Sequence, residues 1–233
     1  PATQMRLLRF TLLAGLAGTL TKFHCRTFWT RKRADSVDDA LLAQWSALDA
    51  PRRIENGRYL SRPGVFAWNR IDPASALLVE CLPTDITGHG ADLGAGWGFL
   101  SLSLLARNPG ITALDLYEAE ARALSLARAN LADAGASATL DFHWHDVTAG
   151  LPQRYDFIVS NPPFHTQSRA DRPDIGQRFI TAAAAALKPG GRLWLVANRH
   201  LPYEQTLNDQ FGEVRVAGER DGFKVIAAVK ARR

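Results

Sequence analysis

Residues 90–98 read GADLGAGWG. Small and apolar residues, typical of a short buried strand, lead into three glycines at alternate positions, Gly94, Gly96 and Gly98. Glycine lets the backbone pass close to a ligand, and a run with helical spacing follows at residues 99–107. This order of strand, loop and helix is the context that a glycine-rich nucleotide-binding loop requires.

Apolar runs alternate with helical patterns on both sides of this loop. The expected strands are residues 90–93, 112–117, 138–142, 155–160, 192–197, 214–217 and 223–229. The expected helices are residues 71–82, with Asp72 as N-cap and Pro73 in the first turn, 99–107, 119–134, 175–187 and 203–211. The last two strands are joined around residues 220–222 and predict a terminal hairpin. The alternation predicts an α/β fold with helices on both faces of a sheet.

The first 70 residues follow a different pattern. Residues 11–29 suggest a small-residue helix or turn followed by a strand, and residues 35–48 have helical spacing with Asp35 or Ser36 as a cap. Proline and glycine then break up residues 49–70, which are expected to be rich in loops.

Positive charge is concentrated at the N-terminus. Residues 1–70 hold 12 Lys and Arg against 5 Asp and Glu, whereas the other residues hold 16 against 18, for a net charge of +5. Arginine and aromatic residues interleave there at Arg52, Arg53, Arg58, Tyr59, Arg62, Phe66, Trp68 and Arg70. Such a mixture suits phosphates and stacked bases. A solvated charged face is the alternative.

The remaining composition excludes several classes of protein. Of 233 residues 46% are hydrophobic and 22% charged, which argues against disorder and coiled coil. Cys25 and Cys81 have no CxxC spacing, so neither a disulfide framework nor a zinc site is expected, and a reducing cytoplasm suits them. The apolar run at residues 10–20 is interrupted upstream by Arg9 and is too short to span a bilayer, so no membrane segment is predicted.

The glycine spacing GxGxG after an acidic residue resembles the first motif of class I S-adenosylmethionine-dependent methyltransferases. The resemblance implies that this loop cradles the methionine part of the cofactor through Asp92, Gly94, Ala95, Gly96 and Gly98. An acid at the end of the next strand should bind the ribose hydroxyls. Asp115 and Glu118 are the two candidates, and Glu118 is favoured because it stands at the exit of the strand.

Asp146 follows the third strand and matches the family position that binds the adenine amine. His143 and His145 lie beside it, which raises the alternative of a metal site. No further ligand follows at motif spacing, so no metal is predicted.

The sequence VSNPPFH ends the fourth strand with Asn161, Pro162 and Pro163. A proline after Asn161 pushes its backbone out of the helical region, at the strand end where α/β sheets bind ligands. The Asn161 side-chain oxygen and the Pro162 carbonyl can accept both N–H bonds of a substrate NH2 group, which favours attack by its nitrogen on a sulfonium methyl. Phe164 can stack on the planar group, and His165 is expected to orient the substrate or contact RNA. An ordinary turn is the alternative for Asn-Pro alone.

Taken together, the motifs resemble the methyltransferase small domain of bacterial ribosomal RNA guanine-N2 methyltransferases. The resemblance covers about residues 57–230 and includes RPGVF at residues 62–66 and GFKV at residues 222–225. It implies a Rossmann-like, seven-stranded, mostly parallel sheet with a C-terminal antiparallel hairpin, S-adenosylmethionine as cofactor, and ribosomal RNA or the small ribosomal subunit as partner. It also implies a cytoplasmic enzyme, with a monomer favoured.

The resemblance further implies which residues form the site. Those expected to bind substrate are Arg62, Phe66, Phe164 and His165. Those expected to be catalytic are Asn161, Pro162, Pro163 and Phe164, with Asn161 also contacting the cofactor.

These expectations divide the chain into a basic segment and linker at residues 1–55 and a catalytic domain at residues 56–233. The family also has a degenerate N-terminal methyltransferase-like domain, for which residues 1–55 are too few; they resemble its remnant. Two other functions stay open: N-methylation of a protein glutamine or DNA adenine, and a non-catalytic RNA-binding module. His165 argues against the protein substrate, because glutamine methyltransferases generally have tyrosine after the prolines.

Overall fold

The structure, a computed structural model, describes residues 16–22, 25–30, 38–132, 138–163 and 173–232. The chain divides into two compact units, Pro1–Pro51 and Arg52–Arg233. No helix in the described part of the chain is long and apolar enough to cross a membrane.

The first unit begins with a β-hairpin. Its strands β1 (Leu16–Lys22) and β2 (Cys25–Thr30) are antiparallel. The expected helix or turn is therefore wrong from residue 16 onward, and residues 11–15 lie outside the described residues. Extension suits this stretch because Thr19 and Thr21 are β-branched and pair with β2. Gly18 is needed there, since a Cβ would lie 2.3 Å from the Trp29 ring.

Helix α2 (Asp39–Asp49) follows and begins later than expected. Its N-cap is Asp38, whose Oδ1 accepts a hydrogen bond from Leu41 N at 2.9 Å. The caps expected from the sequence, Asp35 and Ser36, lie outside the described residues.

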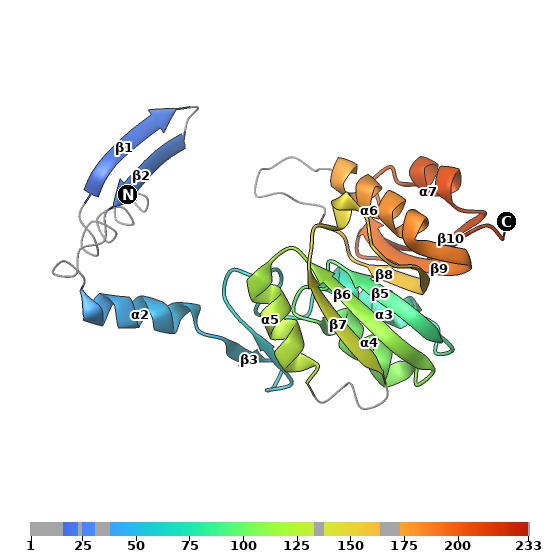
Figure 1. Cartoon of the computed structure of the whole chain (residues 1–233), viewed down its shortest axis with the longest axis horizontal. Helices are drawn as coiled ribbons and strands as arrows, with labels where there is room; N and C mark the ends of the chain where they lie inside the picture. The colour runs from blue at the N-terminus through green and yellow to red at the C-terminus, as the bar shows by residue number, and fades with distance from the viewer. Residues whose placement is uncertain (1–15, 23–24, 31–37, 133–137, 164–172, 233) are drawn as a thin grey trace. The chain divides into compact units, whose positions relative to one another are not determined.

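The second unit is built on a seven-stranded sheet (Figure 1). Its strands are β5 (Gly88–Leu93), β6 (Ile111–Glu118), β7 (Thr139–Trp144), β8 (Tyr155–Ser160), β9 (Leu187–Asn198), β10 (Glu213–Arg220) and β11 (Phe223–Val229). The order is β10-β11-β9-β8-β5-β6-β7; β11 is antiparallel to both of its neighbours, β10 and β9, and the other neighbouring strands are parallel. The predicted fold class and terminal hairpin are confirmed.

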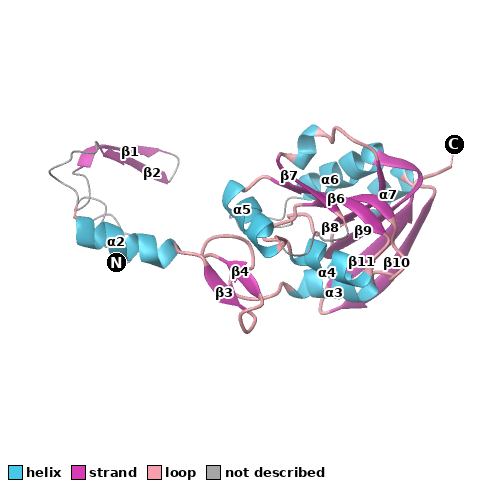
Figure 2. Cartoon of the chain, turned by 60° about the horizontal axis from the view of Figure 1, so that its bottom comes forward, coloured by secondary structure: helices cyan, strands magenta, loops and turns pink. Residues whose placement is uncertain are grey.

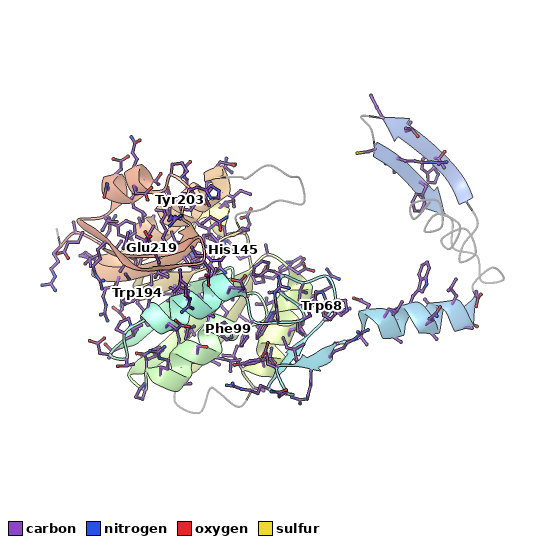
Figure 3. The ribbon with its side chains drawn as sticks, turned by 180° about the vertical axis from the view of Figure 1, so that it is seen from behind. Trp68, Phe99, His145, Trp194, Tyr203 and Glu219 are labelled. Atoms are coloured by element: carbon purple, nitrogen blue, oxygen red, sulfur yellow. The ribbon has the colours of Figure 1, made fainter. Side chains whose placement is uncertain are left out.

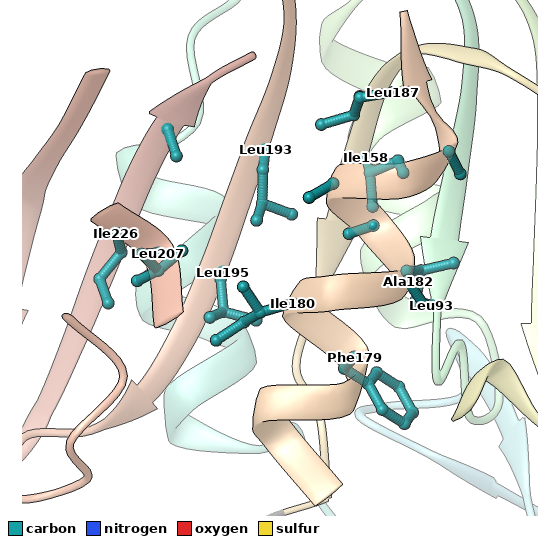
Figure 4. Packing of buried hydrophobic residues seen from close by; sticks show 14 of the residues in the cluster. Leu93, Ile158, Phe179, Ile180, Ala182, Leu187, Leu193, Leu195, Leu207 and Ile226 are labelled. Carbon is teal, nitrogen blue, oxygen red and sulfur yellow. The ribbon is translucent and has the colours of Figure 1, made fainter. Parts of the chain in front are cut away.

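Helices cover both faces of this sheet (Figure 2). They are α3 (Pro73–Cys81), α4 (Phe99–Arg107), α5 (Ala121–Asn130), α6 (Pro173–Ala186) and α7 (Glu204–Gln210). One core lies between the sheet and α3, α4 and α5. The other lies between the sheet and α6 and α7, where Ile180 lies beside Leu195 of β9 (Figure 4). Because both faces are covered, the carboxyl edge of the parallel strands is the natural place for a ligand.

A second hairpin lies where only loops were expected. Strands β3 (Arg52–Ile54) and β4 (Tyr59–Ser61) are antiparallel, and their turn has positive φ at Glu55, Asn56 and Gly57. A third apolar cluster holds the hairpin on the second unit, with Tyr59, Val65 and Trp97 at its centre. Trp68 and Phe99 pack against this cluster (Figure 3).

Local contacts explain two of the element boundaries that differ from the prediction. Helix α5 starts after Glu120, because the Glu118 carboxylate takes the Glu120 N–H and turns the chain first. Helix α6 ends at Ala186 instead of residue 187, and the chain passes directly into β9, which begins at Leu187 instead of residue 192 because Leu187 already pairs with Tyr155 of β8.

Candidate active site

The glycine-rich loop joins β5 to α4 at the carboxyl edge of the sheet. Gly94, Gly96 and Gly98 all have positive φ, of 74°, 56° and 94°. The loop is pinned to the neighbouring strand, since Gly94 N and Ala95 N both donate to the carbonyl of Tyr117, at 2.9 and 3.1 Å. The backbone therefore turns in a conformation that side chains disfavour.

Two of these glycines differ in their surroundings. A Cβ on Gly98 would lie 2.7 Å from Leu131 Cδ1, so this glycine allows α4 to pack against the end of α5. A Cβ on Gly96 would meet nothing within 4 Å. The loop at Gly96 thus faces open space that a bound group can occupy.

Asp92 lies at the end of β5 just before this loop and is fully buried. Its Oδ2 accepts a hydrogen bond from Ser101 Oγ at 2.7 Å, whereas Oδ1 is buried without a partner among the described residues. Burial raises the pKa of Asp92 to about 7, against the lowering effect of the Ser101 hydrogen bond. An unsatisfied buried carboxylate oxygen beneath the loop is a potential acceptor for a polar or cationic group.

Glu118 ends β6, and its carboxylate reaches the loop. Oε2 accepts from Gly96 N at 2.8 Å, and Oε1 accepts from Glu120 N at 2.7 Å. The side chain is half-buried, so one edge is open to solvent. The carboxylate consequently stands beside Gly96, at the open part of the loop.

Asp115 has a different environment. Tyr155 Oη donates to its Oδ2 at 2.6 Å and accepts from Tyr117 Oη at 2.6 Å, while His89 Nε2 lies 3.1 Å from its Oδ1. Burial, followed by the hydrogen bond to Asp115, raises the pKa of the Tyr155 hydroxyl. The Asp115 carboxylate is itself buried within the sheet, so the structure brings Glu118, and not Asp115, to the glycine loop.

Asp146 follows β7 at the same edge of the sheet and is exposed. It caps the 3-10 turn η3 (Val147–Ala149), where its Oδ1 accepts from Thr148 N at 2.9 Å and Thr148 Oγ1 at 2.8 Å. These bonds hold the pKa of Asp146 below its ordinary value. His145 N donates to Glu118 O at 3.1 Å, which ties the ends of β6 and β7 together.

Within the described ranges, no group of three or more His, Cys, Asp or Glu could hold a metal ion.

Asn161 follows β8 and lies against the glycine loop from the other side. Ser160 Oγ donates to Leu93 O at 2.8 Å, and a Cβ on Gly94 would lie 3.8 Å from the Asn161 carbonyl oxygen. The Asn161 side-chain nitrogen donates to Asp72 Oδ2 at 2.9 Å and to Ser75 Oγ at 2.8 Å. The Asn-Pro-Pro segment and the cofactor loop predicted from the sequence are thus adjacent.

The other predicted acceptor residues are placed only in part. Pro162 is buried and Pro163 is exposed. Phe164 and His165 lie outside the described residues. Phe66 is 68% exposed and lines one cavity together with other residues of the site: Ala67, Asp72, Ser75, Gly94, Ala95, Gly96, Trp97, Phe99, Leu100 and Asn161.

Arg62 does not line that cavity. Its carbonyl accepts a hydrogen bond from Val65 N at 3.4 Å in the turn that leads from β4 toward Phe66. Of the two upstream residues predicted to bind substrate, the structure brings Phe66 to the cavity and leaves Arg62 beside the β3–β4 hairpin.

Two residues that support the site, Asn130 and Asp72, were not predicted to do so from the sequence. Asn130, at the end of α5, donates from Nδ2 to Leu60 O at 2.9 Å and to Trp97 O at 2.8 Å, and its Oδ1 accepts from Leu60 N at 2.7 Å. Asp72 was predicted only as a helix cap, although it also binds Asn161. No local pattern marks these residues, because their partners are far away in the sequence.

The methyltransferase small domain family matches residues 56–227. The ribosomal RNA small subunit methyltransferase C of Alcanivorax borkumensis is 38% identical over 173 residues, which cover 73% of this chain and 51% of that protein. The protein of the same name from Chromohalobacter salexigens is 40% identical over 178 residues, 74% of this chain and 51% of that protein. The chain spans about half the length of these curated relatives.

A solved structure is similar over nearly the whole chain. It is the 16S rRNA N2 methyltransferase of T. thermophilus in complex with AdoMet and guanosine, with 27% identity and a TM-score of 0.72. The similarity covers 98% of this chain and 62% of that one.

Proposed function

The chain belongs to the methyltransferase small domain family, and on that premise we propose that it uses S-adenosylmethionine to methylate the exocyclic N2 amine of a guanine in ribosomal RNA. The names of its relatives and the AdoMet and guanosine bound to the T. thermophilus structure support this function. The catalytic domain is taken as residues 56–233, and residues 1–55 as a basic segment and linker.

The donor half of the proposed site consists of the glycine loop, Glu118 and Asp146. Residues 94–98 would hold the methionine part, and the buried Asp92 would support the loop from below. The Glu118 carboxylate would accept hydrogen bonds from the ribose hydroxyls, and Asp146 would bind the adenine amine. When bound, the cofactor supplies an electrophilic methyl group on a sulfonium sulfur. The residues present fit S-adenosylmethionine, because Gly96 faces open space and the Glu118 carboxylate beside it can accept hydrogen bonds.

The acceptor half is the Asn161-Pro162 segment. Its position carries the proposal: Asn161 lies at the carboxyl end of β8, directly against the loop that would hold the cofactor. The Asn161 side-chain oxygen and the Pro162 carbonyl would accept the two N–H bonds of the guanine amine and favour a nitrogen with a free lone pair. That nitrogen would bond to the methyl carbon as the carbon–sulfur bond breaks, and the proton would then pass to solvent.

Aromatic and basic residues around this segment suit an RNA substrate. Phe66 is exposed at the rim of the cavity, and Phe164 is proposed to stack on the guanine. Arg62 and His165 are proposed to contact the RNA. Since the N2 amine of a paired guanine lies within the duplex, the base would be flipped out or taken from unfolded RNA.

Both halves of the proposed site come from one chain, which favours a monomer as the working unit. The proposed substrate is found in the cytoplasm, and the reducing conditions there also suit the two free cysteines. The chemistry assigned to these residues is nucleophilic attack on a methyl group, for which a preorganised amide suffices without a metal.

The test is transfer of tritiated methyl groups with naked ribosomal RNA, isolated small subunits, DNA and total protein as competing acceptors. We expect label in RNA, and in N2-methylguanosine after digestion to nucleosides. Label in protein glutamine or in DNA adenine would replace the proposed substrate with one of the alternatives. Absence of transfer to every acceptor, together with retained RNA binding, would favour a non-catalytic module.

A further inference from the structure

The Asn161 side chain is fixed to the start of helix α3, on a distant part of the chain. Its Nδ2 donates one hydrogen bond to Asp72 Oδ2 at 2.9 Å and another to Ser75 Oγ at 2.8 Å. These bonds span 89 and 86 residues of sequence. Both hydrogens of the amide are therefore committed to α3.

The chemistry of Asp72 decides which way the amide points. The two ends of an amide have nearly the same shape, and only the hydrogen-bond partners distinguish them. A carboxylate has acceptors and no donor, so the NH2 end of Asn161 must face Asp72. A flipped amide would set two acceptor oxygens against each other. The Asn161 oxygen is consequently directed away from α3.

This role goes beyond capping the helix. As the N-cap of α3, Asp72 needs only the bond that its Oδ2 accepts from Ser75 N at 2.9 Å. Asp38 makes the equivalent bond at the start of α2, to Leu41 N. At Asp72 the same oxygen also holds Asn161. Hydrogen bonds in a chain polarise one another, so donation from Nδ2 also strengthens the Asn161 oxygen as an acceptor.

We propose that Asp72 is a positioning residue for methyl transfer, which holds the Asn161 amide with its oxygen directed toward the acceptor NH2 group. Ser75 supplies the second point of attachment. Asp72 touches no reacting atom and acts only through Asn161. The inference rests on the function proposed above, because the oriented oxygen matters only for a substrate with an NH2 group.

Asp72→Ser tests the proposal, because serine is a good N-cap but its shorter side chain does not reach Asn161. We expect kcat to fall about ten-fold or more, the effect of losing a well-made hydrogen bond. The KM for ribosomal RNA and the Kd for S-adenosylmethionine, measured by calorimetry, should change by less than kcat does, because Asp72 lines the cavity but is proposed to act on the reacting group only through Asn161. Asp38→Ser is the matched control and should leave kcat unchanged. Equal kcat values for the two variants would overturn the proposal.

A double variant separates positioning from general damage. In an Asn161→Ala background, Asp72→Ser should cause no further loss of rate in single-turnover assays, because the residue through which it acts is gone. The same fold-loss in both backgrounds would show that Asp72 acts independently of Asn161.

A second measurement does not depend on activity. With 15N labelling, the Asn161 side-chain NH2 signals should show slow hydrogen exchange in the unaltered chain and fast exchange in Asp72→Ser. Fast exchange in both proteins would contradict the positioning role, whatever the substrate. Slow exchange in a chain that methylates no guanine would instead count against the proposed function alone.

Discussion

Replacing Asp92 by asparagine should stabilise the protein, and increasingly so as the pH rises. Asp92 is fully buried, and its pKa is raised from 3.8 to about 7, chiefly by burial. Asparagine has nearly the same shape and can still accept the hydrogen bond from Ser101 Oγ. The variant therefore removes a buried charge without leaving a cavity.

The sign and size of the effect follow from the two protonation states. Below about pH 3 the carboxyl is largely neutral in both the folded and the unfolded chain, and its ionisation contributes almost nothing. As the pH rises toward 7, the unfolded chain releases the proton and the folded chain retains it, so the folded state loses relative stability. Each pKa unit corresponds to about 1.4 kcal/mol. The raised pKa of Asp92 thus lowers the stability of the folded state by about 2 kcal/mol at pH 5, where the folded chain retains the proton, and by about 4 kcal/mol at pH 8, where the buried carboxyl is ionised.

Urea unfolding of both proteins between pH 5 and pH 8 measures this difference. The free energy of unfolding of Asp92→Asn should exceed that of the unaltered chain by an amount that grows by about 3 kcal/mol over this range. Asp85→Asn is the control, because that carboxyl is 80% exposed and solvent screens its charge. A difference that stays constant with pH, or shrinks, would refute the reasoning.

Four other substitutions test the proposed site. Asn161→Ala should lower kcat by about 100-fold or more while calorimetry shows S-adenosylmethionine binding nearly intact, because the lost oxygen acts mainly in the transition state; unchanged turnover would contradict its role. Glu118→Ala should weaken cofactor binding by about ten-fold or more, since it removes a charged acceptor, and an unchanged Kd would return Asp115 to consideration as the ribose ligand. Gly96→Ala should cost about 1 kcal/mol in unfolding free energy from its positive φ but impair cofactor binding, because its Cβ enters the open space at the loop. Gly98→Ala should instead cost about 3 kcal/mol, because strain adds to a clash with Leu131; equal stability of the two alanine variants would contradict this distinction.

Much of the fold of the second unit could be predicted, because its local sequence patterns favour the same helices and strands that the tertiary structure contains. The alternation of apolar runs and helical spacings predicted all seven strands of the sheet and the hairpin at its end. Helix α4 was predicted at its observed bounds, since the glycines before it leave a clear start. The cap of α3 was correct because Asp72 and Pro73 are both strong signals for a helix start.

The failures have physical causes as well. Strands β3 and β4 have three residues each, too few to show an alternating pattern between the surrounding prolines and glycines. In the first hairpin, alanines and glycines suggested a helix or turn, whereas pairing with β2 and the space needed by Trp29 decided the conformation.

The candidate site was predictable in its motifs but not in its supports. The glycine loop, Glu118 and Asn161 stand at strand ends, and the ends of parallel strands meet at one edge of the sheet. The burial of Asp92 and the bond from Asn161 to Asp72 depend on which residues meet across the fold. A single sequence contains no signal for such a meeting.

The bond between Asn161 and Asp72 also has a consequence for how the protein is made. Asp72 leaves the ribosome 89 residues before Asn161, an interval on the order of 10 s at typical bacterial rates of synthesis. During this time strand β5 can pair with β6, but its other edge, which later binds β8, has no partner from this sheet. A nascent chain therefore completes its glycine-rich loop well before its Asn161 segment, and it carries an open strand edge on which chaperones or aggregation can act until β8 emerges.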